Sequence, residues 1–236
     1  MRLPIKRKDM DYLSYWVIMI GIMVLSLIVQ QTLQSRFNKY SKISSPSGLT
    51  GAQVAEKMLR DHGITDVKVV SIKGKLTDHY NPTDKTVNLS EGVYGARSIA
   101  AAAVAAHECG HVVQHAVGYA PLKMRTALVP VVSFASNIVT WVILAGLLLI
   151  EVFPGLIWIG ILLFALTTLF SFITLPVEIN ASQRAVAWLE NAGITNYETR
   201  EYAVDALKWA AYTYVIAAIS SLATLLYYIM IARSRD

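Results

Sequence analysis

Long runs of apolar residues and one extended polar region make up most of this chain. Four runs reach or exceed the roughly 20 residues that a helix needs to cross a bilayer. They cover residues 12–33, 127–153, 156–175 and 211–232. A Pro-Gly pair is all that separates the second run from the third, so these two predict a helical hairpin. The pattern is typical of an integral membrane protein with four transmembrane helices.

The polar region between the first two runs has the pattern of a small α+β unit. Thr50 is placed to cap a helix whose apolar positions, three and four residues apart, share one face. Residues 67–72 and 85–89 resemble short strands, and Ser98 is placed to begin a further helix. The expected fold class is therefore mainly α, with four transmembrane helices and a small α+β domain at one membrane surface.

The end of the chain is expected to be helical on both sides of a short turn. Residues 177–193 have a helical pattern, and Thr195 or Asn196 is placed to cap a last helix that continues into the fourth apolar run. The resulting division is an N-terminal tail, a first transmembrane helix, a polar subdomain, a transmembrane hairpin, a helical segment, and a fourth transmembrane helix with a C-terminal tail. Their bounds are 1–11, 12–33, 34–125, 126–176, 177–210 and 211–236.

Composition agrees with a membrane location and disfavours a nucleic-acid-binding or disulfide-stabilised protein. Charged residues make up 16% of the 236 residues, against about 25% in soluble domains. The net charge is +5, but the basic residues are dispersed and lie mainly beside apolar runs, which suits lipid headgroups better than nucleic acid. The single cysteine, Cys109, rules out an intrachain disulfide.

One motif in the chain indicates chemistry: His107-Glu108-Cys109-Gly110-His111, which reads H-E-x-x-H within an Ala-rich helical run. Histidines four residues apart on a helix share a face and can bind one metal ion, while the adjacent carboxylate can take a proton from a metal-bound water. The alternative is a pair of core or interfacial histidines. The helical context and the small Gly110 favour the metal site.

A catalytic zinc usually has three protein ligands and one open position. His115 shares the helical face, but about 12 Å of straight helix separates it from His107 at 1.5 Å per residue. We therefore expect His115 to be a surface residue or a partner of a ligand.

Topology narrows the carboxylate candidates for the third ligand. Glu151 lies in the hairpin turn, on the opposite side of the membrane from the motif, whereas Glu178 follows the third run and returns to the side of the motif. An ionised group at the end of an apolar run is costly unless it is paired or coordinated, so Glu178 is the expected ligand. The alternative for Glu178 is an acid that complements a helix dipole. Four more acids lie on the same side in ordinary amphipathic sequence: Glu190, Glu198, Glu201 and Asp205.

Several segments together resemble the bacterial membrane-bound neutral zinc metallopeptidase family 2, whose members are gluzincin-like. They are residues 47–55, 78–82, 87–90, 105–115 and 176–182. The resemblance covers nearly the whole chain after the first run. It implies a zinc metalloprotease domain with His107, His111 and Glu178 on one Zn²⁺ per chain. One departure is Ser182, where related membrane proteases often have Asp.

The expected function is a membrane-embedded zinc metalloprotease that hydrolyses peptide bonds of proteins or peptides near the membrane surface. Glu108 would act as general base toward a zinc-activated water. Candidates for transition-state or substrate contacts are His79, Asn88, Arg184, Tyr212 and Tyr214. Each also has an ordinary interpretation as a loop, interfacial or snorkelling residue. We further expect residues 86–90 to form an edge strand that pairs with an extended substrate, or else a plain structural strand.

The number of spans and the flanking charges bear on which side of the membrane the site faces. With four spans, both termini lie on one side of the cell membrane and the site lies on the other. The hairpin turn has no Lys or Arg, while basic residues flank the second span on the side of the site, so we expect a cytoplasmic site. The charges around the first span favour the reverse.

Two alternative functions stay open. One is a non-catalytic zinc-binding scaffold or chaperone-like protein, and the other is a zinc hydrolase of a non-peptide amide. The expected partners are a protein or peptide substrate and the lipid bilayer, with no nucleic acid.

Overall fold

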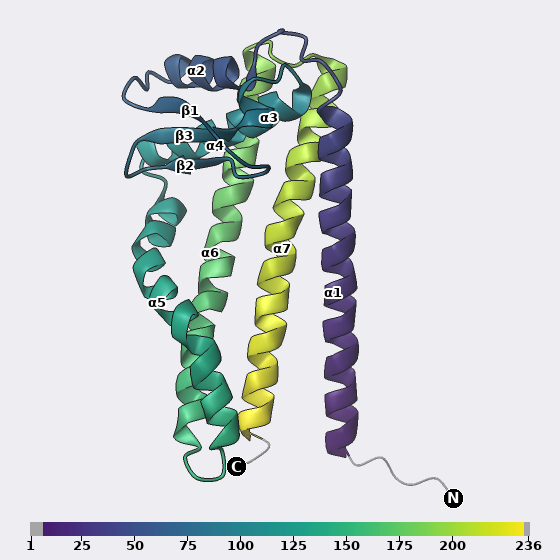
Figure 1. Ribbon diagram of the computed structural model, residues 1–236, viewed down its shortest axis with the longest axis vertical. Helices are drawn as coiled ribbons and strands as arrows, with labels where there is room; N and C mark the ends of the chain where they lie inside the picture. Colours follow the sequence, from purple (N-terminus) through teal and green to yellow (C-terminus); the bar gives the residue numbers. More distant parts are fainter. Residues whose placement is uncertain (1–6, 234–236) are drawn as a thin grey trace, which may run out of the picture. The chain divides into compact units, whose positions relative to one another are not determined.

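The computed structural model describes residues 7–233, which form helices, one small sheet and short connections (Figure 1). In chain order the elements are α1 Arg7–Tyr40, α2 Gly51–Asp61, β1 Lys68–Ile72, β2 His79–Asn81, β3 Thr86–Ser90, α3 Glu91–Tyr94, α4 Ile99–Ala116, α5 Ala120–Leu148, α6 Gly155–Asn191 and α7 Tyr197–Arg233. Of the expected N-terminal tail, residues 1–6 lie outside the described residues and residues 7–11 already belong to α1. The chain divides into two compact units, and α1, α5, α6 and α7 have residues in both.

The first unit contains the membrane-length segments. It comprises the described parts of Met1–Val29, Arg125–Ile173 and Thr213–Asp236. Helices α5 and α6 pack closely at Gly146 and Gly160, where an added Cβ would lie 2.8 Å from the Ile157 backbone and 2.7 Å from the Ile143 side chain. Helices α6 and α7 are joined by a 2.7 Å hydrogen bond between the Thr168 and Ser221 hydroxyls.

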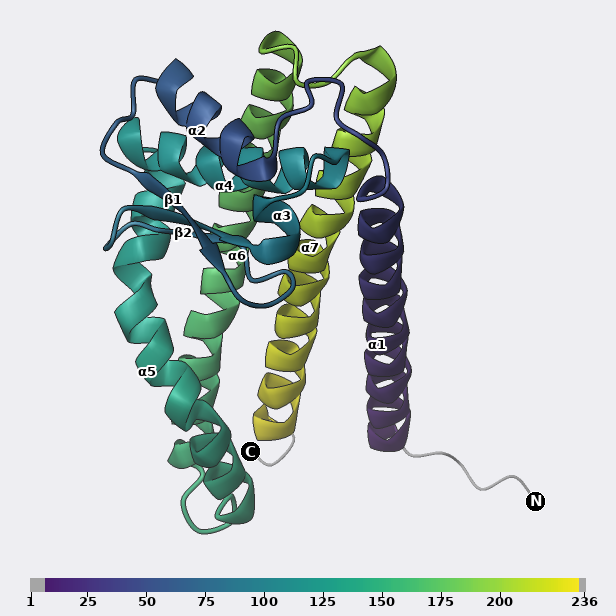
Figure 2. The same ribbon diagram turned by 45° about the horizontal axis from the view of Figure 1, so that its top comes forward.

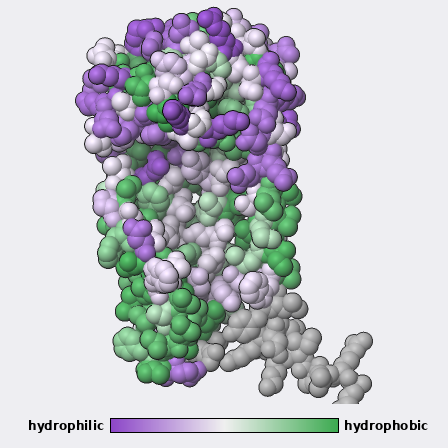
Figure 3. Space-filling view, viewed as in Figure 1, coloured by the Kyte–Doolittle hydropathy of each residue, from purple (hydrophilic) through white to green (hydrophobic). Residues whose placement is uncertain are grey.

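The surfaces of these helices suit a lipid environment. Within residues 7–233, four helices are long and apolar enough to cross a membrane, yet only 6–28% of the most apolar stretch of each is buried inside the protein. Figure 3 shows hydrophobic side chains exposed along them, where lipid rather than water would cover them. The expected mainly-α membrane fold with a small α+β part is confirmed.

The second unit comprises Gln30–Met124 and Thr174–Tyr212, and it holds the polar subdomain. Thr50 caps α2 as expected: its hydroxyl accepts from the Gln53 backbone N–H, and the Gln53 side chain accepts from the Thr50 backbone N–H. Such a cap is worth about 1 kcal/mol. The apolar face of α2 then packs against the Ala-rich α4 and the sheet, in a core of fully buried side chains. Its members include Val54, Ala55, Met58, Val87, Leu89, Ala102, Ala105 and Ala106.

The sheet has three strands in the order β1-β3-β2, and they follow one another in this order away from α2 in Figure 1. β1 is parallel to β3, and β2 is antiparallel to it. Figure 2 shows the strands side by side next to α4. The expectation that residues 86–90 form an edge strand is wrong, because β3 is paired on both sides. β2 was not anticipated, since three residues are too few to show an alternating pattern.

Helices α6 and α7 both continue without a break beyond the expected membrane runs. Pro176 lies inside α6 although proline removes one helical hydrogen bond, so residues 155–191 form one helix where the sequence suggested a boundary. Asn196 caps α7 through its side-chain oxygen, which accepts from the Thr199 backbone N–H at 2.9 Å. The residues before and after Pro176 therefore belong to the same helix.

Candidate metal centre

Helix α4 supplies the two histidines of the H-E-x-x-H motif. Ser98 begins the helix by accepting a hydrogen bond from the Ala101 backbone N–H. His107 and His111 then lie one turn apart on the same face, with ring centroids 4.8 Å apart and ring planes at 83°. Their Nε2 atoms point to a common neighbour on α6.

That neighbour is Glu178, which lies two residues after Pro176. Its Oε2 is 3.3 Å from His107 Nε2 and 3.5 Å from His111 Nε2. The close approach of α6 to α4 depends on Gly110, because an added Cβ there would lie 2.6 Å from the carbonyl oxygen of Ala181. The small residue inside the motif thus permits the carboxylate to reach both histidines.

The donor set fits a zinc ion. The three side chains form a cluster whose potential ligand atoms all lie within 4.8 Å of one another. Zinc binds imidazole nitrogen and carboxylate oxygen at about 2.0–2.2 Å, so two ligand atoms on a tetrahedral ion are about 3.4 Å apart. The two nitrogen–oxygen distances of 3.3 and 3.5 Å match this spacing. Three protein ligands would also leave the open position of a catalytic site.

The outward nitrogen of each histidine has its own partner. The Ser182 hydroxyl lies 3.1 Å from His107 Nδ1, and the side-chain oxygen of Gln114 lies 3.1 Å from His111 Nδ1. Partners of this kind fix the ring orientation and leave Nε2 toward the metal. In the sequence Ser182 is visible only as a departure from related proteases, and Gln114 has no predicted role. A polar residue within the apolar run after His111 was the available signal.

Negative charge gathers at the cluster. Glu108 and Glu178 are both buried. Burial opposes protonation of His111, but the hydrogen bond with Glu178 and the nearby charge of Glu108 outweigh it, so the pKa of His111 is raised. A site that stabilises a proton on His111 also favours a cation bound there. Cys109 takes no part, because its fully buried thiol donates to the carbonyl of Ala55.

The other sequence candidates lie elsewhere in the fold. His115 is exposed, with its Nδ1 2.9 Å from the Tyr80 hydroxyl. His79, at the start of β2, contacts the Thr77 carbonyl, and Asn88 hydrogen bonds to Thr86 within its own strand.

Among the remaining candidates, Arg184 donates to the Asn180 side chain at 2.8 Å. Tyr212 packs on Trp209 and lies beneath Lys208 on α7. Tyr214 and Glu151 belong to the first unit, and Glu151 occupies the turn between α5 and α6. In the part of the chain that the structure describes, the candidates that come together as possible metal ligands are therefore His107, His111 and Glu178.

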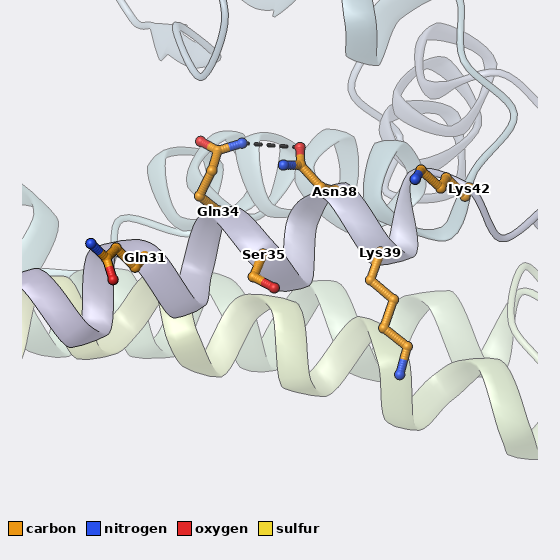
Figure 4. Close-up of a pocket in the computed structure, with 6 residues that line it drawn as sticks. All are labelled: Gln31, Gln34, Ser35, Asn38, Lys39 and Lys42. Carbon is orange, nitrogen blue, oxygen red and sulfur yellow. Dashed lines mark hydrogen bonds between the residues drawn. The ribbon is translucent and has the colours of Figure 1, made fainter.

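A hollow on the surface of the second unit has a different character. Figure 4 shows its lining on α1 and the turn after it, with a hydrogen bond from Gln34 to Asn38. The lining residues are Gln31, Gln34, Ser35, Asn38, Lys39 and Lys42. Amides, a hydroxyl and ammonium groups are poor zinc ligands, whereas the cluster on α4 and α6 could hold a metal ion.

An H-E-x-x-H helix with a converging carboxylate, on a chain whose described residues include four membrane-length helices, is typical of membrane zinc peptidases. Residues 15–233 match the model of a family described as "Putative neutral zinc metallopeptidase", and the chain belongs to this family. Over 212 residues it is 44% identical to the "Putative membrane protease YugP" of Bacillus subtilis (strain 168), an overlap of 90% of this chain and 93% of the relative. No solved structure matches the chain. The expected family, the membrane location and the zinc cofactor are thereby confirmed.

Proposed function

We propose that this protein is a zinc-dependent endopeptidase that hydrolyses peptide bonds of proteins or peptides at the membrane. The observation that carries the proposal is the convergence of two Nε2 atoms and one carboxylate oxygen at tetrahedral spacing, beside the buried Glu108. The family and the relative named as a membrane protease support the same reaction class.

His107, His111 and Glu178 are the residues that would hold the metal. A zinc ion bound there supplies a Lewis acid that polarises a peptide carbonyl and makes a water molecule more acidic. The carboxylate of Glu178 offsets part of the charge of the ion, and the two neutral imidazoles hold its position.

Glu108 is the proposed general base. It accepts one proton from the attacking water as the water oxygen bonds to the carbonyl carbon, and it delivers that proton to the amine nitrogen as the C–N bond breaks. Its place between the two histidines in the motif suits this role, and its burial keeps bulk water from competing for the proton. The products are one carboxylate and one amine.

The extended substrate backbone has a place to bind at β2 rather than at β3. β2 is an edge strand of the described sheet, and it packs against α4, which carries the motif. Strand addition at such an edge supplies backbone hydrogen bonds that do not depend on substrate sequence. His79 lies exposed at the start of this strand and is the substrate contact that we favour among the sequence candidates.

The test is turnover of a quenched peptide library by the purified full-length protein. We expect cleavage by the zinc-loaded parent and none by Glu108→Gln, although the variant keeps its zinc, because an amide cannot accept the proton. Glu190→Gln, an exposed site on the same helix as Glu178, is the matched control and should cleave like the parent. Equal turnover by Glu108→Gln and the parent would remove Glu108 as the base. Turnover of non-peptide amides alone would change the substrate class.

We further propose that the metal site faces the cytoplasm. The support is the absence of Lys and Arg from the hairpin turn, residues 149–154, which lies across one span from the motif. Val152 is 83% exposed in that turn. A membrane-impermeant thiol reagent should therefore label Val152→Cys in intact cells, and labelling only after permeabilisation would reverse the orientation.

A further inference from the structure

A chain of side-chain hydrogen bonds leads from Arg184 on α6 to His111 on α4. Arg184 Nε donates to Asn180 Oδ1 at 2.8 Å. Gln114 Nε2 donates to the same Asn180 oxygen at 3.1 Å and to the Val177 carbonyl at 2.8 Å. Gln114 Oε1 lies 3.1 Å from His111 Nδ1. Gln114 is fully buried, one turn after His111.

The chemistry of these groups determines where the hydrogens lie. A backbone carbonyl only accepts, so the Gln114 atom facing Val177 must be the NH₂ group. A guanidinium only donates, so the Asn180 atom facing Arg184 must be its oxygen, which accepts the second Gln114 hydrogen. Both donors of Gln114 are thereby used, and its oxygen must face His111. The hydrogen of the neutral His111 ring is therefore on Nδ1.

This arrangement prepares His111 for a metal. A neutral imidazole with its hydrogen on Nδ1 has its free lone pair on Nε2, the atom that lies 3.5 Å from Glu178. We propose that Gln114, oriented by Asn180 and Arg184, is a positioning residue that holds His111 in the tautomer and ring orientation that bind zinc. The inference rests on the metal site of the proposed function.

The other histidine has no such constraint. Ser182 lies 3.1 Å from His107 Nδ1, but a hydroxyl can donate or accept, so it is compatible with either tautomer. The hydrogen-bond chain through Gln114 thus selects a single tautomer of His111, because its end groups can only donate or only accept. Arg184, which has only donors, anchors the whole chain.

The test measures zinc affinity by competition with a chromophoric chelator, using metal-depleted full-length protein in detergent. Gln114→Met removes the acceptor at similar volume, and we expect about tenfold to hundredfold weaker zinc binding, the usual effect of losing such a partner. Asn180→Asp keeps an acceptor for both donors and should bind zinc like the parent, whereas Asn180→Leu should bind it more weakly. Gln183→Met, an exposed neighbour on α6, is the matched control and should be unchanged.

A second measurement reads the tautomer directly, without metal. In metal-depleted protein labelled with ¹⁵N-histidine, at alkaline pH where the His111 ring is neutral, we expect the His111 signal of the Nδ1–H form in the parent, assigned by its loss in His111→Gln. An Nε2–H form in the parent would overturn the inference. So would parental zinc affinity in Gln114→Met, or equal zinc binding by Asn180→Asp and Asn180→Leu. If Gln114→Met does not fold, the Asn180 pair and the parent spectrum decide.

The two proposals fail separately. A parent protein that binds no zinc would refute the metal site, while the tautomer measurement would still decide the role of Gln114. A parent that binds zinc but cleaves no peptide would refute only the protease activity.

Discussion

Gly110 provides the sharpest test of how the site is assembled. In Gly110→Ala, the new Cβ would lie 2.6 Å from the Ala181 carbonyl oxygen and 3.1 Å from its Cα. Ordinary contacts begin near 3.5 Å, so α6 must move about 0.9 Å away from α4. Both contacts are to backbone, and no side-chain rotation can relieve them.

The consequences for stability and for metal binding differ in size. Alanine gains about 1 kcal/mol over glycine in a helix interior, while overpacking costs about 1–3 kcal/mol. The free energy of unfolding should therefore fall by only about 0–2 kcal/mol. Glu178 is carried by the same helix, three residues before Ala181, and metal–ligand distances tolerate only about 0.2 Å. We expect zinc affinity and peptide turnover to fall about 100-fold.

The assay is zinc competition on the purified protein, with thermal unfolding measured in parallel. Gly21→Ala is the matched control, because Gly21 also lies inside a helix but its added Cβ would meet nothing within 4 Å. That variant should keep the parental zinc affinity. A Gly110→Ala protein that binds zinc as tightly as the parent would show that the α4–α6 approach does not set the ligand geometry.

Three further predictions concern Ser182, Cys109 and Asp61. Ser182→Ala should weaken zinc binding about tenfold or more because His107 loses its partner, and Ser182→Asp should bind zinc more tightly than Ser182→Ala, both measured by chelator competition. Burial raises the pKa of the Cys109 thiol, so an aromatic disulfide reagent at pH 8 should find no reactive thiol in the native protein and one per chain after denaturation. The hydrogen bond from Lys57 lowers the pKa of Asp61, so Asp61 contributes stability above its unfolded pKa of about 3.9 and loses it as the pH falls through the folded pKa. Asp61→Asn should therefore melt below the parent at pH 7, and the difference between the two melting temperatures should shrink as the pH falls below about 3.9.

The sequence predicted the parts of the fold that depend on local pattern. Apolar runs of membrane length became α1, α5, α6 and α7, and the Thr50 cap was visible because its partner Gln53 lies three residues away. β2 and the central position of β3 were not predictable, since both depend on how the loops on either side of β2 set the strand order. The continuation of α6 through Pro176 also depends on packing beyond the local sequence.

In the candidate site, too, the sequence predicted what depends on local spacing and not what depends on packing. His107 and His111 could be paired from spacing alone, and span counting selected Glu178, 67 positions beyond His111 along the chain. The roles of Gln114 and Ser182 needed the structure, because each contact depends on the approach and rotation of α6 against α4. Arg184 shows the limit most clearly. The sequence predicts a substrate contact, which stays a prediction, and only the fold shows that its Nε donates to Asn180.

The central claim is that His107, His111 and Glu178 hold one zinc ion, and zinc content per chain tests it most directly. Elemental analysis of purified protein should find about one zinc per chain in the parent and in the exposed-site control Glu190→Ala. Glu178→Ala should retain far less, because two imidazoles alone bind zinc weakly. One zinc per chain in Glu178→Ala, equal to the parent, would contradict the assignment of Glu178 as a ligand.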